Sequence, residues 1–379
     1  MLSLTSILAV VLATFAVAAV LVATQNWHGH FSMDSNFGVQ KIHAHPTPRI
    51  GGIAIALGLL VGWFLSEGEP QKTLGLILLA GLPALLFGLA EDVTKQVGVW
   101  PRLLATMSSG VFAWYLTGVA MQKTGLPPLD WVLQFLPLAV LFTAYAVGGF
   151  ANAINIIDGF NGLAVGASAI MFAIMGMVAT KINDPHLAQI CQIATWCAVG
   201  FALVNWPMGR IFLGDGGAYL LGFVLAWLAV LLPMRNEGIT AWVTVMVCAY
   251  PVIEVGFSVR RKRSREGHHP GQPDRVHLHH LLHRRVACKL FPKASKPLQN
   301  GLTSPLCWVL IALPGAWAYT FHNRSVMLAI GFGLMVFAYA ALYARLSQFR
   351  WCFSALTLKP ISSHGLPAPK SAVGSTKNR

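Results

Sequence analysis

Several carboxylates of this chain lie at the edges of apolar runs, beside glycine, asparagine or histidine. Glu91 and Asp92 form a pair that closes one such run. Neighbouring carboxylates can hold Mg²⁺ through their hard oxygens, or one can act as a base because its neighbour raises its pKa. The alternative interpretation of this pair is a helix end that forms a salt bridge with Lys95.

A second polar segment joins two strongly apolar runs. Asn152, Asn155 and Asp158 are spaced three residues apart, so on a helix they share one face. Gly159 and Gly162 then allow a turn in which backbone and side-chain oxygens approach a ligand closely. The register of three oxygen-bearing side chains favours a ligand-binding segment over a plain loop.

Asp215 lies between glycines just before another apolar run. An aspartate at a helix start is a common N-cap. The same position offers free N–H groups and the positive end of the helix dipole to a phosphate, with Asp215 available for its metal. Mg²⁺ usually takes one or two carboxylates plus waters and substrate phosphates, so Asp215 and one neighbour would suffice.

Histidines gather in the segment 273–283, which also holds Asp274 and Arg275. Zinc is one interpretation, but zinc sites usually bring cysteine or a close second pair of ligands. Imidazoles beside Arg275 suit a phosphate or pyrophosphate through charge-assisted hydrogen bonds. A solvated loop is the third interpretation. The histidines concerned are His277, His279, His280 and His283.

A fifth segment, 43–52, leads into the second apolar run. Its Pro-Thr-Pro sequence favours an extended approach, and the following Gly51-Gly52 permits close helix packing. Arg49 lies between these two features. It can contact an anionic substrate, or it can serve only as a basic anchor at the membrane surface.

The elements that position these residues are apolar helices. The chain has 379 residues, of which 55% are hydrophobic and 11% charged, against about 25% charged in soluble domains. The pattern predicts an all-α polytopic membrane protein with 10–11 transmembrane helices, because apolar runs approach the length that spans a bilayer. We expect spans near 4–24, 50–65, 73–90, 103–120, 132–150, 163–180, 188–206, 216–233, 240–258, 305–321 and 326–344. The six cysteines are scattered, which fits apolar packing better than disulfides.

Basic residues predict the orientation of these spans. The first 24 residues lack a basic start, which favours an uncleaved first helix with its amino end outside. Alternation then leaves single basic residues in the outside loops and places the dense basic segments inside, as the positive-inside rule requires. The net charge of +14 follows from this topology and from attraction to anionic membrane lipids, so nucleic acid binding is not needed. The basic residues placed outside are Lys72, Lys123, Lys181, Arg235 and Arg324.

All five chemical segments fall on the inside face, which predicts a single cytoplasmic site in a bacterial inner membrane. Residues 1–346 form one membrane domain with cytoplasmic loops, and the tail 347–379, rich in Pro, Ser and Lys, is predicted to be disordered. A transporter is the main alternative, but transporters place ionisable residues near the bilayer midplane, and the centres of these spans are almost free of charge. The cytoplasmic loops lie near 25–49, 91–102, 151–162, 207–215 and 259–304.

Taken in this order, the five segments resemble the polyprenyl-phosphate N-acetylhexosamine-1-phosphate transferases, the superfamily that includes the MraY and WecA types. The resemblance covers roughly residues 40–285 and includes His-Leu-His-His at 277–280, which looks like the WecA branch. That form favours an enzyme that uses a UDP-N-acetylhexosamine donor for surface polysaccharide. It disfavours the phospho-N-acetylmuramoyl-pentapeptide transferase of peptidoglycan synthesis. The resemblance rests on 45–52, Glu91-Asp92, 152–164, 212–217 and 274–280.

The resemblance implies a Mg²⁺-dependent transfer, with Mn²⁺ as a substitute, from UDP-GlcNAc or a related UDP-sugar to undecaprenyl phosphate, with UMP as leaving group. This is an in-line displacement in which a metal and cations neutralise charge on the transferred phosphoryl group. The resemblance also allows a homodimer. The implied catalytic residues are Asp92, Glu91 and Asp158, the metal ligands Asp215 and Asn155, and the substrate-binding residues His277, His279, His280, Arg275, Asn152, Asn161 and Arg49.

Two positions depart from the family pattern. Glu91 stands where the family often has aspartate, so Asp92 is the firmer functional assignment. Glu254 stands where an aspartate is usual in the WecA-like branch. If the change at Glu91 had disabled the site, the chain would be a membrane scaffold without activity.

Overall fold

The computed structural model of the protein describes residues 2–34, 46–263 and 276–348. Arg275, Asp274 and the predicted tail from residue 349 onward lie outside these described residues. The first half of the chain contains α1 (Leu4–Ala23), α2 (Gln25–Ser32), α3 (Gly52–Phe64), α4 (Gly68–Ala80), α5 (Leu82–Thr94), α6 (Val99–Thr117), α7 (Pro127–Val132), α8 (Leu136–Ile157) and α9 (Leu163–Lys181). A short antiparallel ribbon joins β1 (Met33–Asp34) to β2 (Thr47–Pro48).

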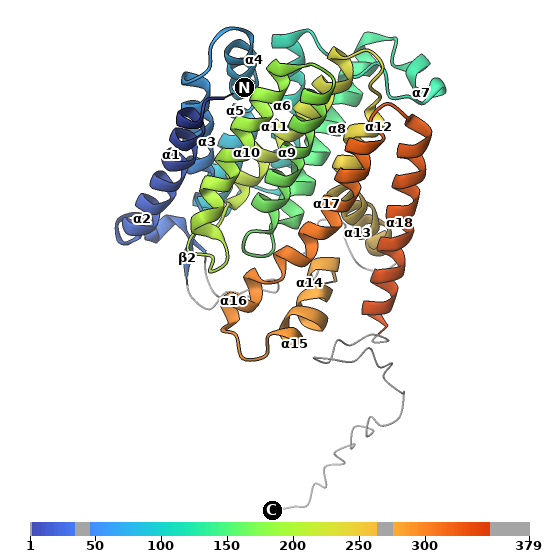
Figure 1. Cartoon of the computed structure of the whole chain (residues 1–379). Helices are drawn as coiled ribbons and strands as arrows, with labels where there is room; N and C mark the ends of the chain where they lie inside the picture. Colours follow the sequence, from blue (N-terminus) through green and yellow to red (C-terminus); the bar gives the residue numbers. More distant parts are fainter. Residues whose placement is uncertain (1, 35–45, 264–275, 349–379) are drawn as a thin grey trace, which may run out of the picture.

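The second half is also helical. It contains α10 (Pro185–Asn205), α11 (Gly214–Arg235), α12 (Ala241–Val247), α13 (Ala249–Arg263), α14 (Leu278–Leu282), the π-helical turn His283–Ala287, α15 (Cys288–Leu290), α16 (Lys296–Gly301), α17 (Ser304–Thr320) and α18 (Ser325–Ser347). The long helices run side by side as a bundle (Figure 1).

The described residues confirm the predicted fold class. Helices or bent helix pairs occupy all eleven apolar runs. Seven single helices are long and apolar enough to cross a membrane, or nine spans if each of two bent pairs counts as one, and α3 is a shorter apolar helix. The chain is therefore a multi-pass membrane protein.

Two of the predicted spans are broken rather than straight. The pair α4–α5 bends by 45° at Gly81, and the pair α12–α13 bends by 76° at Cys248. Pro83 and Pro251 lie just inside the second helix of each pair. A proline has no N–H to donate and crowds the carbonyl four residues earlier, so the helix breaks before it.

Helix α11 runs through the middle of the bundle and is buried along nearly its whole length (Figure 1). It packs against α3, α5, α8 and α9. A Cβ on Gly88 of α5 would lie 2.5 Å from the Cα of Gly216, and one on Gly52 of α3 would lie 2.6 Å from the backbone N of Gly217. Only glycine permits such close approach, so backbone meets backbone where α3, α5 and α11 cross.

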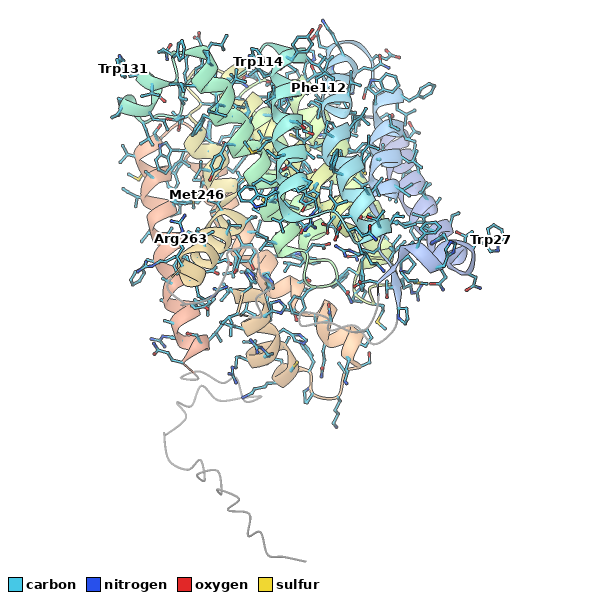
Figure 2. The ribbon with its side chains drawn as sticks, turned by 180° about the vertical axis from the view of Figure 1, so that it is seen from behind. Trp27, Phe112, Trp114, Trp131, Met246 and Arg263 are labelled. Carbon is cyan, nitrogen blue, oxygen red and sulfur yellow. The ribbon has the colours of Figure 1, made fainter. Side chains whose placement is uncertain are left out.

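The shorter elements gather at one end of the bundle. Figure 1 shows α2, β2, α14, α15 and α16 at the lower end, whereas α7 lies at the upper end. In Figure 2 the exposed Trp131 of α7 marks the upper end, and Trp27 projects outward from α2 lower down. The segments singled out as candidates for binding or catalysis lie toward this lower end.

Candidate active site

The centre of the candidate site is a contact between α5 and the start of α11. Asp92 is fully buried, and its two carboxylate oxygens accept the backbone N–H groups of Asp215 and Gly216 at 2.8 and 2.9 Å. These N–H groups have no partner within their own helix, because they belong to its first turn. Asp92 therefore caps α11 from another helix. Our expectation that Asp215 is the N-cap and that these N–H groups are free for a phosphate is wrong, since α11 begins at Gly214 and Asp92 occupies them.

Two arginines neutralise the two buried aspartates. Arg49 pairs with one carboxylate oxygen of Asp215 and Arg102 with the other. The Nε of Arg49 also lies 3.2 Å from Oδ1 of Asp92. Buried carboxylates are costly unless they are paired and hydrogen-bonded, and both conditions are met here.

The loop that carries Arg49 is locked to the loop that precedes α11. The backbone N–H of Arg49 donates to the carbonyl of Ser32 at 2.9 Å. The N–H of Phe212 donates to the carbonyl of Pro48 at 2.8 Å, and the N–H of Gly51 donates to the carbonyl of Phe212 at 3.1 Å. These bonds fix residues 48–51 of the predicted 43–52 segment against Phe212 at the start of the predicted 212–217 segment.

The contact between the Arg49 loop, Asp92 and the start of α11 requires glycine at position 214. Its φ of +74° belongs to the left-handed region, and a Cβ there would lie 2.4 Å from the carbonyl oxygen of Arg49 and 2.6 Å from Oδ2 of Asp92. Both strain and contact exclude a side chain at this position.

Glu91 supports the same cluster from its edge. One of its oxygens accepts the backbone N–H of Val97 at 2.7 Å, and the other lies 4.0 Å from Nη1 of Arg102. Lys95 instead donates to the carbonyl of Met33 at 2.5 Å. The alternative interpretation of Glu91 as a partner of Lys95 is thus not what the structure shows.

Arg102 is a site residue that no sequence motif pointed to. It lies in the first turn of α6 and contacts both Asp215 and Glu91. Its only signal in the sequence is a basic residue at the start of the helix after the Glu91-Asp92 pair. Other basic residues of the predicted inside loops also lie near carboxylates in the sequence, so this signal does not single out Arg102.

Helix α8 carries the predicted asparagines and ends at Ile157, two turns beyond the predicted end of the span. Asn152 donates from Nδ2 to Oγ1 of Thr106 at 3.0 Å and to the carbonyl of Gly148 at 2.8 Å, while Asn155 lies half-buried on α8. Asp158 follows as the C-cap residue. Burial raises the pKa of Asp158 to about 7, with a further increase from the charge of Asp215 and a decrease from that of Arg49. Asp158 therefore lies within electrostatic range of the arginine–aspartate cluster.

Asn161 holds three segments together. Its backbone N–H donates to Oδ1 of Asn300 at 2.7 Å, and its Nδ2 donates to the carbonyl of Pro207 at 3.1 Å. Its carbonyl accepts a hydrogen bond from Oγ of Ser304 at 2.6 Å. These contacts are all to protein groups, and a contact between Asn161 and substrate stays a prediction.

The histidines pack on the turn that follows α8. Phe160 lies with its ring centroid 5.7, 5.2 and 5.0 Å from the rings of His279, His280 and His283. The rings of His277 and His279 are stacked at 5.3 Å. Burial lowers the pKa of His279 well below its usual value, and the neighbouring His280 and His277 lower it further. His279 is therefore neutral at pH 7, and its contact with a substrate phosphate stays a prediction.

The arrangement of ligands bears on the metal. In residues 2–34, 46–263 and 276–348, no three His, Cys, Asp or Glu side chains come together as a metal-binding group. A structural zinc needs such a group. Mg²⁺ needs only one or two protein carboxylates when substrate phosphates and waters complete its shell. Asp215 fits that second requirement, with Asp158 close enough for the two charges to interact, and Asn155 as the second ligand stays a prediction.

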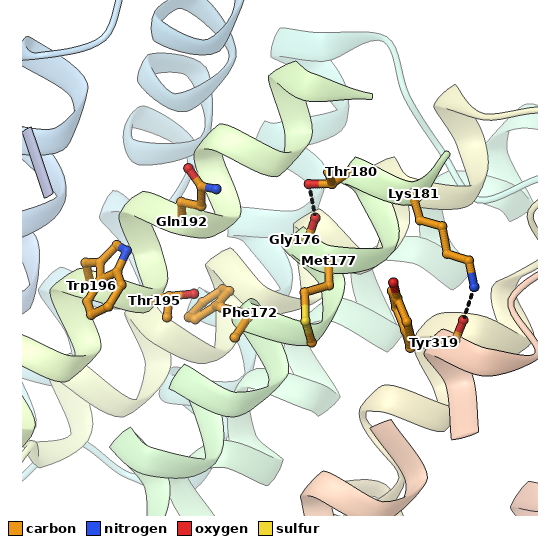
Figure 3. A pocket seen from close by; sticks show the side chains of 10 residues that line it. Phe172, Gly176, Met177, Thr180, Lys181, Gln192, Thr195, Trp196 and Tyr319 are labelled. Atoms are coloured by element: carbon orange, nitrogen blue, oxygen red, sulfur yellow. Dashed lines mark hydrogen bonds between the residues drawn. The ribbon is translucent and has the colours of Figure 1, made fainter. Parts of the chain in front are cut away.

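A cavity of about 460 Å³ lies elsewhere, between α9, α10 and α17 (Figure 3). Its walls include Phe172, Met177, Thr195 and Tyr319, and Lys181 lies at its edge, donating to the carbonyl of Tyr319. No residue of the predicted site lines it. The cavity and the arginine–aspartate cluster are separate features of the bundle.

The chain is similar in sequence to known transferases. The model of glycosyl transferase family 4 matches residues 74–233, which include Asp92, Asp158 and Asp215. The undecaprenyl-phosphate alpha-N-acetylglucosaminyl 1-phosphate transferase of Yersinia pestis is 27% identical over 282 residues, which cover 73% of this chain and 72% of that protein. The decaprenyl-phosphate N-acetylglucosaminephosphotransferase of Mycobacterium tuberculosis H37Rv is 27% identical over 339 residues, covering 79% and 78%. Residues 74–233 are therefore similar to glycosyl transferase family 4, and about three quarters of the chain is similar to these two transferases.

Proposed function

We propose that this protein transfers N-acetylglucosamine 1-phosphate from UDP-GlcNAc to undecaprenyl phosphate and releases UMP. The observation that carries the proposal is the cluster of Asp92, Asp215, Arg49 and Arg102 beside Asp158, at the end of the bundle where the histidines lie. The relatives whose names state this donor group and a polyprenyl-phosphate acceptor support the choice of substrates.

The two arginines are suited to the donor pyrophosphate. A guanidinium group binds phosphate oxygens through paired charge-assisted hydrogen bonds. Arg49 and Arg102 are held in place by Asp215, and the backbone bonds around Pro48 and Phe212 also fix the loop of Arg49, so both arginines are oriented before substrate arrives. A pyrophosphate entering here competes with Asp215 for both guanidinium groups.

The reaction forms one P–O bond and breaks another. An oxygen of the polyprenyl phosphate attacks the phosphorus that bears the sugar, and the bond from this phosphorus to the bridging oxygen breaks, so UMP leaves with that oxygen. Any proton on the attacking phosphate must go to a base. Asp158 is suited to accept it, because a pKa of about 7 matches the working pH.

Asp92 and Glu91 act differently from Asp158 in this proposal. Asp92 is fully buried and engaged with Asp215, Gly216 and Arg49, so it holds the start of α11 rather than moving a proton. Glu91 orients Arg102. The histidines His277 and His280 contribute donors for phosphate oxygens.

We assign Mg²⁺ to Asp215, with Asn155 as its second protein ligand. Bound there, the cation would neutralise charge on the pyrophosphate as it develops on the leaving UMP. The proposed site faces the cytoplasm in a bacterial inner membrane with the amino end outside, as the positive-inside distribution favours. The reaction would start the assembly of a cell-surface polysaccharide.

The test is UMP release by purified protein with Mg²⁺, undecaprenyl phosphate and UDP-GlcNAc. Release that depends on the lipid supports the proposal. Release with another UDP-N-acetylhexosamine, but not with UDP-GlcNAc, retains the chemistry and changes the sugar. Release with UDP-N-acetylmuramoyl-pentapeptide alone makes the protein a peptidoglycan enzyme. Folded protein that releases no UMP with any of these donors overturns the proposed function.

A further inference from the structure

A carboxylate that the proposed reaction does not use lies behind the histidines. Glu254 of α13 is fully buried. Its Oε1 accepts a hydrogen bond from Nδ1 of His277 at 2.8 Å, and its Oε2 accepts one from the hydroxyl of Tyr339 at 2.8 Å. The backbone N–H of Leu278 lies 3.3 and 3.2 Å from the two oxygens. Glu254 thus binds the first residues of the histidine segment on one side and α18 on the other.

The bond to Glu254 decides which nitrogen of His277 faces away from the carboxylate. A carboxylate accepts only, so Nδ1 of His277 carries the proton and donates it. The other ring nitrogen, Nε2, then faces the ligand, and it donates to a phosphate oxygen when the ring carries its second proton. The ring plane is held as well, because His277 stacks on His279 with an angle of 4° between the rings.

Tyr339 connects this arrangement to the last described helix. It is 2% exposed, and its ring packs against Phe257 at 4.7 Å and stacks with Tyr343 at 6.3 Å. Its hydroxyl donates to Glu254, which lies 85 residues earlier in the chain. Helix α18 therefore contacts the histidine segment through one buried carboxylate.

A purely structural role does not account for this choice of residues. A buried carboxylate is more costly than an apolar side chain of similar volume, even when it is well paired. Among the described residues, the hydrogen-bond donors to Glu254 are His277, Leu278 and Tyr339 of α18. Partners of this kind orient a functional histidine and select its tautomer.

We propose that Glu254 and Tyr339 are positioning residues for His277, through which α18 sets the orientation of the ring that contacts substrate phosphate. The inference rests on the proposed function, since it assigns how that same site is held. Glu254 and Tyr339 touch no substrate. They act through the direction and the proton of the His277 ring.

The first test compares two tyrosines of α18. Tyr339→Phe removes only the hydroxyl bonded to Glu254, so we expect kcat for UMP release to fall by about three- to tenfold with KM little changed. The matched control is Tyr343→Phe, which lies one turn further along and whose hydroxyl accepts from Arg261 at 3.3 Å. It should leave kcat within about twofold. Equal kcat values for the two variants would overturn the inference.

The second test is a double-mutant cycle between Glu254→Gln and His277→Ala. If Glu254 acts through His277, the change to Gln lowers kcat by about ten- to a hundredfold in the wild-type background and by less than about twofold once the imidazole is gone. Losses that multiply in the double variant would mean that Glu254 only stabilises the fold. Melting temperatures show which variants are folded, and the tyrosine pair decides the matter if Glu254→Gln does not fold.

These outcomes are separate from the fate of the proposed function. Wild-type protein that releases no UMP overturns the proposed reaction, and the inference with it. Active wild-type protein with multiplicative losses in the cycle overturns the positioning role alone.

Discussion

Asp92 and Asp215 are 123 residues apart in the chain, yet the carboxylate of Asp92 accepts the backbone N–H of Asp215 at 2.8 Å. One aspartate therefore fixes the backbone of the other, and Arg49 contacts both carboxylates. The acidic residue that faces the proposed substrates is held by a second acidic residue that does not. In this proposal Asp215 takes part in the chemistry, and Asp92 holds the backbone that positions it.

Asp215→Asn should lower kcat for UMP release by about a hundred- to a thousandfold. The substitution removes the charge that pairs with Arg49 and Arg102 and that would hold the metal. The matched control is Asp184→Asn, which caps α10 by accepting the N–H of Leu187 at 3.0 Å. It should leave kcat nearly unchanged and lower stability only through the weakened ion pair with Arg235 at 3.3 Å, because asparagine caps a helix as well as aspartate does. Equal losses of kcat in both variants would contradict the assignment.

Removal of divalent cations should abolish UMP release by the wild-type protein. Chelation with EDTA followed by Mg²⁺ should restore it, and Mn²⁺ should restore it in part, because both ions accept carboxylate and phosphate oxygens. Binding of Mn²⁺ to the protein with UDP-GlcNAc, followed by its electron spin resonance, gives a readout independent of turnover. Full activity in EDTA would exclude the metal from the proposal.

The activity of the wild-type protein should rise with pH through neutrality. Burial raises the pKa of Asp158 to about 7, so the carboxyl is protonated and unable to accept a proton below that pH, and is a carboxylate above it. A base must be in its deprotonated form, so kcat should increase between about pH 6 and about pH 8. Asp158→Asn should flatten this part of the profile. The same slope in both proteins would place the titrating group on the lipid phosphate instead.

Gly88→Ala should destabilise the protein through a backbone contact. Its Cβ would lie 2.5 Å from the Cα of Gly216, and neither helix has a flexible side chain at that point to move aside. We expect a loss of about 1–3 kcal/mol, seen as a lower melting temperature. Gly149→Ala is the matched helical control, because nothing lies within 4 Å of its added Cβ. It should be neutral or gain up to about 1 kcal/mol in helix propensity.

Cysteine labelling on either side of α6 tests the orientation. Gln96 and Lys123 are exposed residues in the loops before and after this helix. In a chain with Cys288 and Cys352 replaced by serine, an impermeant maleimide should label Lys123→Cys in intact cells and Gln96→Cys only after the cells are opened. The opposite result would reverse the proposed topology and move the site to the outer face.

The sequence was sufficient to predict the helices because each span is a local property of about 20 residues. It fell short where polar residues continue a helix. Asn152 and Asn155 interrupt the apolar run and were expected beyond its end, but the backbone remains helical to Ile157. The bends at Gly81 and Cys248 were readable in principle, since a proline follows each closely.

The sequence predicted most residues of the candidate site, Arg102 excepted, but not which of them contact one another. The topology placed Asp92, Asp158 and Asp215 on one face, and the structure brings them together. That Asp92 caps α11 and that Arg102 reaches Asp215 depend on how three helices pack. No local pattern encodes such contacts, because each partner is ordinary within its own segment.

The glycine contacts around α11 fix the backbone at the start of that helix. Gly52 and Gly88 press backbone against Gly216 and Gly217, so the first turn of α11 can neither rotate nor slide without a clash. Packed backbone transmits strain rather than yielding to it. A displacement of α3 or α5 would therefore be passed directly to the backbone that carries Asp215.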